Sequence, residues 1–108
     1  MAKTEMLSGT LDLLILRVLN RGALHGFGIA ERIHLLSREV LRVEEGSLYP
    51  ALYRMEAKGW LNAEWGESDR GRRAKFYSLT RAGRKQLESE EQVWDRTSLA
   101  IRDVLENA

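Results

Sequence analysis

The stretch 11–19 restricts the fold of this chain most strongly, because it is apolar almost all round. Only Asp12 and Arg17 interrupt it. The pattern predicts a helix that starts near Ser8 or Thr10 and ends just past the stretch. A helix of this kind must be buried on more than one side. In a chain of 108 residues, about one small domain, we expect one side to face the core and another to face a partner chain.

A second amphipathic stretch, 47–58, is unusual in what lies opposite its apolar stripe. At 100° per residue its apolar residues fall on one side: Leu48, Ala51, Leu52 and Met55. The other side carries a hydroxyl, two rings and one cation: Ser47, Pro50, Tyr53 and Arg54. We expect Ser47 to cap the helix, which places Pro50 at the third helical position, where a missing N–H costs no hydrogen bond. Such a face favours contact with another molecule; a solvated face with an incidental Tyr and Pro is the alternative.

The remaining patterns predict an order of elements around this helix. After the first helix we expect a helix over 27–38, a strand over 40–43, the helix 47–58, strands over 60–65 and 74–79, and a helix over 81–105 capped by Thr80. Three helices followed by a hairpin make a winged helix-turn-helix, whose third helix enters the DNA major groove while the hairpin, or wing, reaches the flanking backbone. We therefore predict a mainly α fold with a small β-hairpin, consisting of a winged-helix domain (1–80) and a C-terminal dimerisation helix (81–108).

The formal net charge of +1 conceals an uneven distribution. From Asp69 to Lys85 there are seven basic residues and one acid, whereas from Glu88 to Glu106 six acids outnumber two arginines. A basic segment beside a recognition helix is the electrostatic pattern of a nucleic-acid-binding protein. Four cations crowd into the predicted wing: Arg70, Arg72, Arg73 and Lys75. Because they repel one another unless an anion binds them, we predict phosphate contacts; a solubilising, solvated turn is the alternative.

On the third helix, four side chains can reach phosphates or base edges: Ser47, Tyr49, Tyr53 and Arg54. Arg54 is the candidate for reading guanine, since a guanidinium can donate two hydrogen bonds to that base. Tyr49 lies at the border of the apolar stripe, so half-buried packing against the second helix is its alternative role.

The last helix carries a seam of apolar residues. Leu87, Trp94 and Ile101 recur every seven residues, and Val104 lies on the same seam, as in a coiled coil. A winged-helix domain of this size cannot cover the seam alone, so we predict a homodimer that binds a palindromic operator in double-stranded DNA. The predicted interface comprises Leu11, Leu14 and Val18 of the first helix and Leu87, Trp94, Ile101 and Val104 of the last.

Four motifs, in order, resemble the PadR family of bacterial transcriptional regulators. They are LSGTLD from Leu7, HGFGIA from His25, GSLYPAL from Gly46 and RRAKFYSLTRAG from Arg72. The resemblance is close over about 7–85, and it implies a winged-helix dimer, usually a repressor, whose C-terminal region dimerises and sometimes senses a small molecule. The single last helix is similar to that of short-tailed members, some of which stack planar ligands on a Trp. That resemblance makes Trp94 a candidate site for a planar aromatic effector; core packing is the alternative.

The sequence lacks the residues that several other classes of function require. The absence of cysteine removes disulfides and thiolate chemistry, and two histidines nine residues apart make a weak metal site, so we predict no metal and no cofactor. There is no nucleophile constellation or phosphate loop, so we expect no enzyme. Without a signal-peptide core or a membrane-spanning run, we predict a cytoplasmic protein with no membrane partner.

We assign Trp60 and Trp65 to core and strand packing. A winged-helix protein-interaction module is the alternative function, although such a wing needs no cluster of cations.

Overall fold

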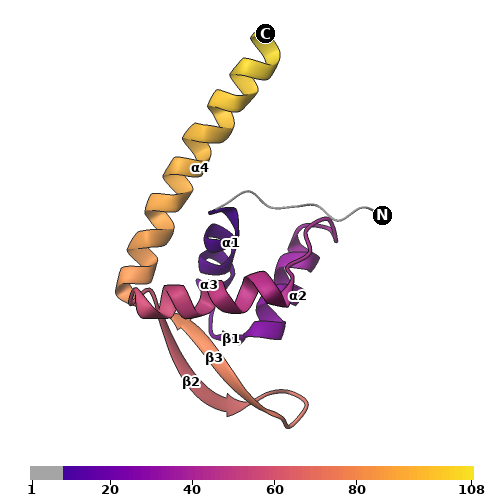
Figure 1. The fold of residues 1–108 in the computed structure, drawn as a ribbon, viewed down its shortest axis with the longest axis vertical. Helices are drawn as coiled ribbons and strands as arrows, with labels where there is room; N and C mark the ends of the chain where they lie inside the picture. Colours follow the sequence, from indigo (N-terminus) through magenta and orange to yellow (C-terminus); the bar gives the residue numbers. More distant parts are fainter. Residues whose placement is uncertain (1–8) are drawn as a thin grey trace.

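The computed structural model describes residues 9–108 and shows a small helical body from which a hairpin and a long helix project (Figure 1). The elements are α1 (Thr10–Leu19), β1 (Leu24–His25), α2 (Gly26–Leu36), α3 (Glu45–Ala57), β2 (Leu61–Glu67), β3 (Arg73–Leu79) and α4 (Arg81–Asn107). Three helices, a wing and a last helix confirm the predicted winged helix-turn-helix. Ser8, the earlier of the two predicted starts of α1, lies outside the described residues.

The core forms around α1, as its apolar pattern predicts. Ile15 and Leu16 have no exposed surface, and α1 contacts α2, α3, β3 and α4. Two residues that we expected at a dimer interface, Val18 and Leu87, belong to this core and are 8% and 4% exposed. Their assignment to the interface was wrong, because α4 folds its first turns back onto α1 and each helix covers the other.

The sheet has three strands rather than a bare hairpin. Its order is β1-β3-β2, and both pairs are antiparallel, with Leu24 opposite Tyr77 and Leu61 opposite Leu79. The additional strand comes from Leu24–His25, immediately before α2, and not from the predicted strand 40–43. The sheet therefore ties the start of α2 to the base of the wing.

The segment 40–43 is a loop because the chain turns sharply after α2. Arg38 and Glu39 adopt left-handed backbone angles, with φ of 55° and 66°, which stop any extended continuation. Leu41 and Val43 still pack against the core from the loop. Their apolar character therefore reflects burial and not a strand.

Helix α3 starts earlier than Ser47, so the predicted cap was wrong. The residue at the N-cap is Glu44, whose carbonyl accepts hydrogen bonds from the backbone N–H groups of Ser47 at 3.0 Å and Leu48 at 2.9 Å. Pro50 is therefore the sixth helical residue and not the third, and its missing N–H leaves one helical hydrogen bond unmade. Glu45, an acid in the first turn, favours the early start because it complements the positive end of the helix dipole.

Helix α4 begins as predicted. The Thr80 hydroxyl accepts the Gly83 N–H at 3.0 Å and caps the helix. Its 27 residues span about 40 Å at 1.5 Å per residue. Within residues 9–108, only Gly83 and Leu87 of this helix are buried, and its C-terminal half extends well beyond the body (Figure 1). In the same described range, no helix combines the length and the hydrophobicity that a bilayer-spanning helix needs.

Candidate nucleic-acid interface

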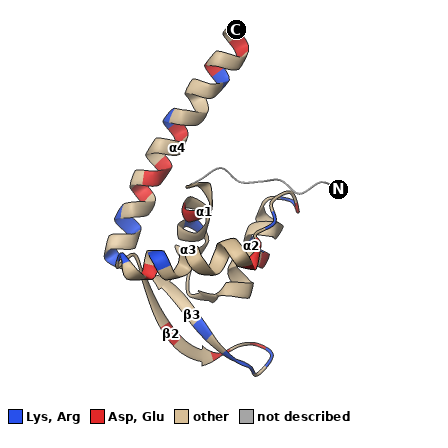
Figure 2. Cartoon of the chain, in the orientation of Figure 1, with Lys and Arg blue, Asp and Glu red and all other residues tan. Residues whose placement is uncertain are grey.

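The outer side of α3 and the wing border one hollow of ≈ 770 Å³, which the start of α2 closes. Six of the eight residues predicted to contact DNA line it: Tyr49, Tyr53, Arg70, Arg72, Arg73 and Lys75. Ser47 is exposed on α3 and is not among the lining residues. Figure 2 shows basic residues at the tip of the hairpin and along β3, while the acidic stretch of α4 lies away from them. The hollow therefore combines positive charge with exposed aromatic rings.

The turn of the wing is held by its own backbone. The Ser68 N–H donates to the Arg72 carbonyl at 2.7 Å, and the Gly71 N–H donates to the Ser68 carbonyl at 2.9 Å. Gly71 has φ of 72°, a left-handed angle that glycine adopts without strain. This closed turn leaves the side chains of Arg70, Arg72 and Arg73 exposed at the tip. Three guanidinium groups on a hydrogen-bonded turn form a surface suited to phosphate.

Lys75 connects the wing to α3. Its Nζ donates to Glu56 Oε1 at 3.1 Å and lies 5.5 Å from the Tyr53 ring centre and 5.6 Å from that of Tyr77. The hydrogen bond to Glu56 raises the pKa of Lys75, so the ammonium stays charged. Because Glu56 already neutralises part of this charge, Lys75 is less available to an anion than the tip arginines, and it joins the wing to α3.

Two exposed aromatic residues of the hollow were missed as site residues. Trp65, which we assigned to packing, is 59% exposed, and the Arg73 guanidinium lies 5.0 Å from its ring centre. Phe27, at the start of α2, is 61% exposed and lines the same hollow. Trp65 shares a face of β2 with Leu61 and is nearer the wing tip, where the helices no longer cover the sheet. Its proximity in sequence to the four cations was the one signal that could have identified it.

Tyr49 takes the packing role that we gave as its alternative and also borders the hollow. It is partly buried against the core. A Cβ placed on Gly26, the first residue of α2, would lie 2.6 Å from the Tyr49 hydroxyl oxygen, so the ring lies directly over this glycine. The ring thus packs against the start of α2 while part of it borders the hollow.

Arg54, predicted to read guanine, is turned toward α1 instead. Its Nη1 and Nη2 donate to the two carboxylate oxygens of Asp12 at 2.7 and 2.8 Å. This hydrogen bonding to Asp12 raises the pKa of Arg54. The two nitrogens that a guanine contact would use are already engaged. In this structure Arg54 pairs with Asp12, and its contact with guanine stays a prediction.

The two histidines serve backbone hydrogen bonds. His25 Nδ1 accepts the Gly28 N–H at 3.0 Å and caps α2, and His34 Nδ1 lies 3.1 Å from the Leu41 carbonyl oxygen. Among residues 9–108, no three His, Asp or Glu side chains gather closely enough to hold a metal ion.

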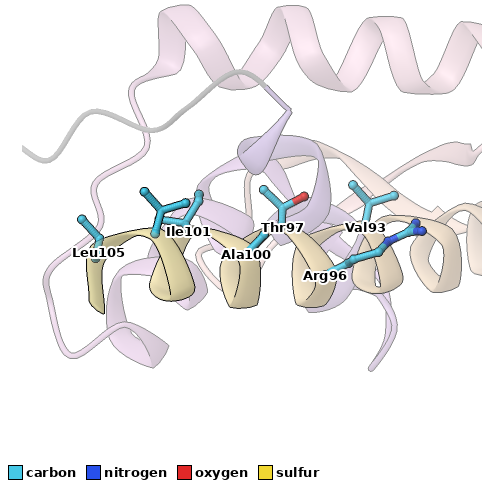
Figure 3. Close-up of a pocket in the computed structure, with 7 residues that line it drawn as sticks. Val93, Arg96, Thr97, Ala100, Ile101 and Leu105 are labelled. Carbon is cyan, nitrogen blue, oxygen red and sulfur yellow. The ribbon is translucent and has the colours of Figure 1, made fainter. Parts of the chain in front are cut away.

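A second exposed surface runs along α4. Figure 3 shows Val93, Thr97 and Ile101 projecting from the same side of this helix. The residues that line the surface are mostly apolar: Val93, Arg96, Thr97, Ala100, Ile101, Val104 and Leu105. Of the residues predicted for the dimer interface, Trp94, Ile101 and Val104 are exposed by 45%, 48% and 64%, whereas Leu11 and Leu14 are partly buried.

Comparison with known proteins agrees with this architecture. Residues 15–89 match the transcriptional regulator PadR-like family. The chain belongs to this family. A PadR-like transcriptional regulator from Bacillus cereus superposes with a TM-score of 0.79 at 28% identity, covering 97% of this chain and 100% of that one. A PadR family regulator from Clostridium difficile gives a TM-score of 0.75 at 31% identity, covering 90% and 99%. A transcriptional regulator of Mycobacterium tuberculosis is 48% identical over 52 residues, 48% of each chain.

As a member of this family, the chain is a transcriptional regulator. The family match spans all three helices of the body from Ile15 onward, the wing and the first turns of α4. The exposed C-terminal half of α4 lies outside the matched residues.

Proposed function

We propose that this PadR-family chain is a sequence-specific DNA-binding repressor, with α3 in the major groove and the wing, 66–74, on the flanking backbone. One observation carries the proposal: the exposed side of α3 and the basic tip of the wing open onto the same hollow. Phosphate contacts by the tip arginines would give affinity, and Tyr53, which is 58% exposed, would reach base edges. The density of cations favours DNA over a protein partner.

We also propose that the chain acts as a homodimer on a palindromic operator. The apolar surface of α4 supports this, because a second α4 would cover side chains that the single chain leaves in water. The exposed ring of Trp94 beside that surface is where a planar aromatic effector would stack. Titration with planar aromatic compounds, followed by Trp94 fluorescence in a variant without the other two tryptophans, tests this part; an unchanged emission contradicts it.

Selection of bound sequences from a random pool of double-stranded DNA tests the central claim. We expect enrichment of a palindromic site by the wild-type protein. Replacing Arg72 and Arg73 by alanine should weaken binding to every sequence and reduce the slope of log K against log salt by roughly 0.9 for each phosphate that the variant no longer neutralises.

The control for the wing variant is Arg102→Ala, which removes a cation from the far part of α4 and should leave the slope unchanged. A wing variant with the wild-type slope would refute phosphate contact by these arginines. Failure of the wild-type protein to enrich any sequence would refute specific DNA binding itself.

A further inference from the structure

One ion pair of the winged-helix body lies outside the hollow and joins α1 to α3. Asp12, in the first turn of α1, is 9% exposed and is the one charged residue buried with the core in the part of the chain that the structure describes. Arg54, near the end of α3, meets it with both terminal nitrogens. A fork of this kind, with two short charge-assisted hydrogen bonds, is both strong and directional.

The fork adds direction to the contact between α3 and the core. The buried residues of α3, Leu48, Leu52 and Met55, hold the helix to the core by apolar contact, which is less directional than hydrogen bonding. The planar pair between Arg54 and Asp12 restrains the rotation of α3 about its axis from the α1 side, as the hydrogen bond from Lys75 to Glu56 does from the wing. Because Tyr53 precedes Arg54 in the chain, the same rotation decides where the exposed ring of Tyr53 points.

The pair is also costly to open. If Arg54 turned toward DNA, the carboxylate of Asp12 would stay nearly buried without its partner, and an unpaired buried charge is strongly unfavourable. Asp12 therefore holds the Arg54 side chain away from the side of α3 that would face the groove.

We propose that Asp12 and Arg54 are positioning residues that set the orientation of α3, and thereby its selectivity between DNA sequences, without touching DNA. This inference rests on the proposed function, since it assumes that α3 reads DNA. It predicts that breaking the pair from either side lowers discrimination between sequences more than it lowers affinity for DNA in general.

The experiment uses the selected operator and a scrambled duplex of the same composition. The variants are Asp12→Asn, Arg54→Gln, the double variant and Arg54→Lys, which keeps a cation at position 54 but removes the fork. Each is measured below its own melting temperature, so that unfolded protein does not contribute. The matched control is Arg17→Gln, which removes another α1 ion pair, the exposed one between Arg17 and Glu91 of α4 at 3.6 Å.

We expect each single variant to bind the operator about tenfold more weakly, the size of one base-specific hydrogen-bonded pair, and the scrambled duplex within about twofold of wild type. The double variant should be no weaker than the weaker single variant, because the two residues act as one unit. The salt slope should not change, since neither residue neutralises a phosphate. The control Arg17→Gln should retain wild-type selectivity.

Three results would overturn the inference, and they are distinguishable. If Asp12→Asn binds the operator at least as tightly as wild type while Arg54→Gln does not, Arg54 reads DNA and Asp12 only restrains it. If every variant keeps wild-type selectivity, the pair serves stability alone. If the wild-type protein selects no operator, the proposed function fails and this inference fails with it.

Discussion

At the scale of single residues, a glycine allows α2 and α3 to meet. A Cβ on Gly26 would lie 2.6 Å from the hydroxyl oxygen of Tyr49 and 2.8 Å from its Cε1, both closer than non-bonded atoms approach. The missing side chain of Gly26 is therefore the space that the Tyr49 ring fills. Since Tyr49 belongs to α3, this close approach helps to determine how the proposed recognition helix lies against α2.

Replacing Gly26 by alanine should lower the free energy of unfolding by about 1–3 kcal/mol, the usual cost of overpacking. Gly28→Ala is the matched control two residues later. Its Cβ would meet its nearest atom at 3.4 Å, an ordinary contact, and alanine should raise stability by up to about 1 kcal/mol because it favours the helix. Urea unfolding of both variants measures the difference. In a Tyr49→Ala background the Gly26→Ala cost should disappear; persistence of that cost would show that Tyr49 is not its source.

Six of the eight residues predicted to contact DNA line the hollow, but the sequence did not predict the roles of Arg54 and Trp65. Tyr53 and the wing arginines could be placed because helical periodicity and turn patterns give the direction of each Cβ. The role of Arg54 could not be predicted, because its long side chain is directed to Asp12, a residue 42 positions earlier in the chain. Trp65 could not, because strand alternation does not reveal how far a hairpin extends beyond the helices that cover it.

At the scale of elements, the boundaries that failed were those set by tertiary contact. The two-residue strand Leu24–His25 exists because β3 pairs with it, and no pattern within two residues can predict a partner in the wing. The segment 40–43 has the composition of a strand, yet it is a loop that supplies apolar side chains to the core. Helix types and order, by contrast, were predictable, because they follow from periodicity over ten or more residues.

The junction between the wing and α4 depends on a second glycine. A Cβ on Gly83 would lie 2.1 Å from the carbonyl oxygen of Trp60, a backbone atom that cannot turn aside. The first turn of α4 therefore rests directly on the chain at the start of β2. The direction in which α4 leaves the body is set at this point.

Gly83→Ala should destabilise the fold by about 3 kcal/mol or more, because either the helix or the strand must move. Gly46→Ala is the matched control, since Gly46 also lies in the first turn of a helix and a Cβ there meets nothing within 4 Å. We expect that control to gain about 0.5–1 kcal/mol. Thermal unfolding followed by circular dichroism compares the two. Equal melting temperatures for Gly83→Ala and wild type would contradict a close approach at this junction.

At the scale of the whole molecule, the body and the C-terminal half of α4 differ in what stabilises them. The body has a continuous core, whereas the last turns of α4 contact nothing else in residues 9–108 and expose Leu99, Val104 and Leu105 by 63%, 64% and 75%. An isolated helix that exposes so much apolar surface is stabilised mainly by packing against another element. In the homodimer that we propose, a second copy would supply such an element with the same sequence and would bring a second wing and a second α3 for the other half of a palindrome.

Ile101→Lys tests this arrangement. Ile101 is 48% exposed in the single chain, so the body should fold normally, but a buried lysine at the centre of a dimer interface would disfavour association. We expect light scattering to give the mass of one chain for the variant and of two for wild type. Gln92→Lys is the control with the same charge change, nine residues earlier and therefore on the opposite side of α4. The monomeric variant should bind a half-site as wild type does and lose the preference for the full palindrome; a dimeric Ile101→Lys would place the interface elsewhere.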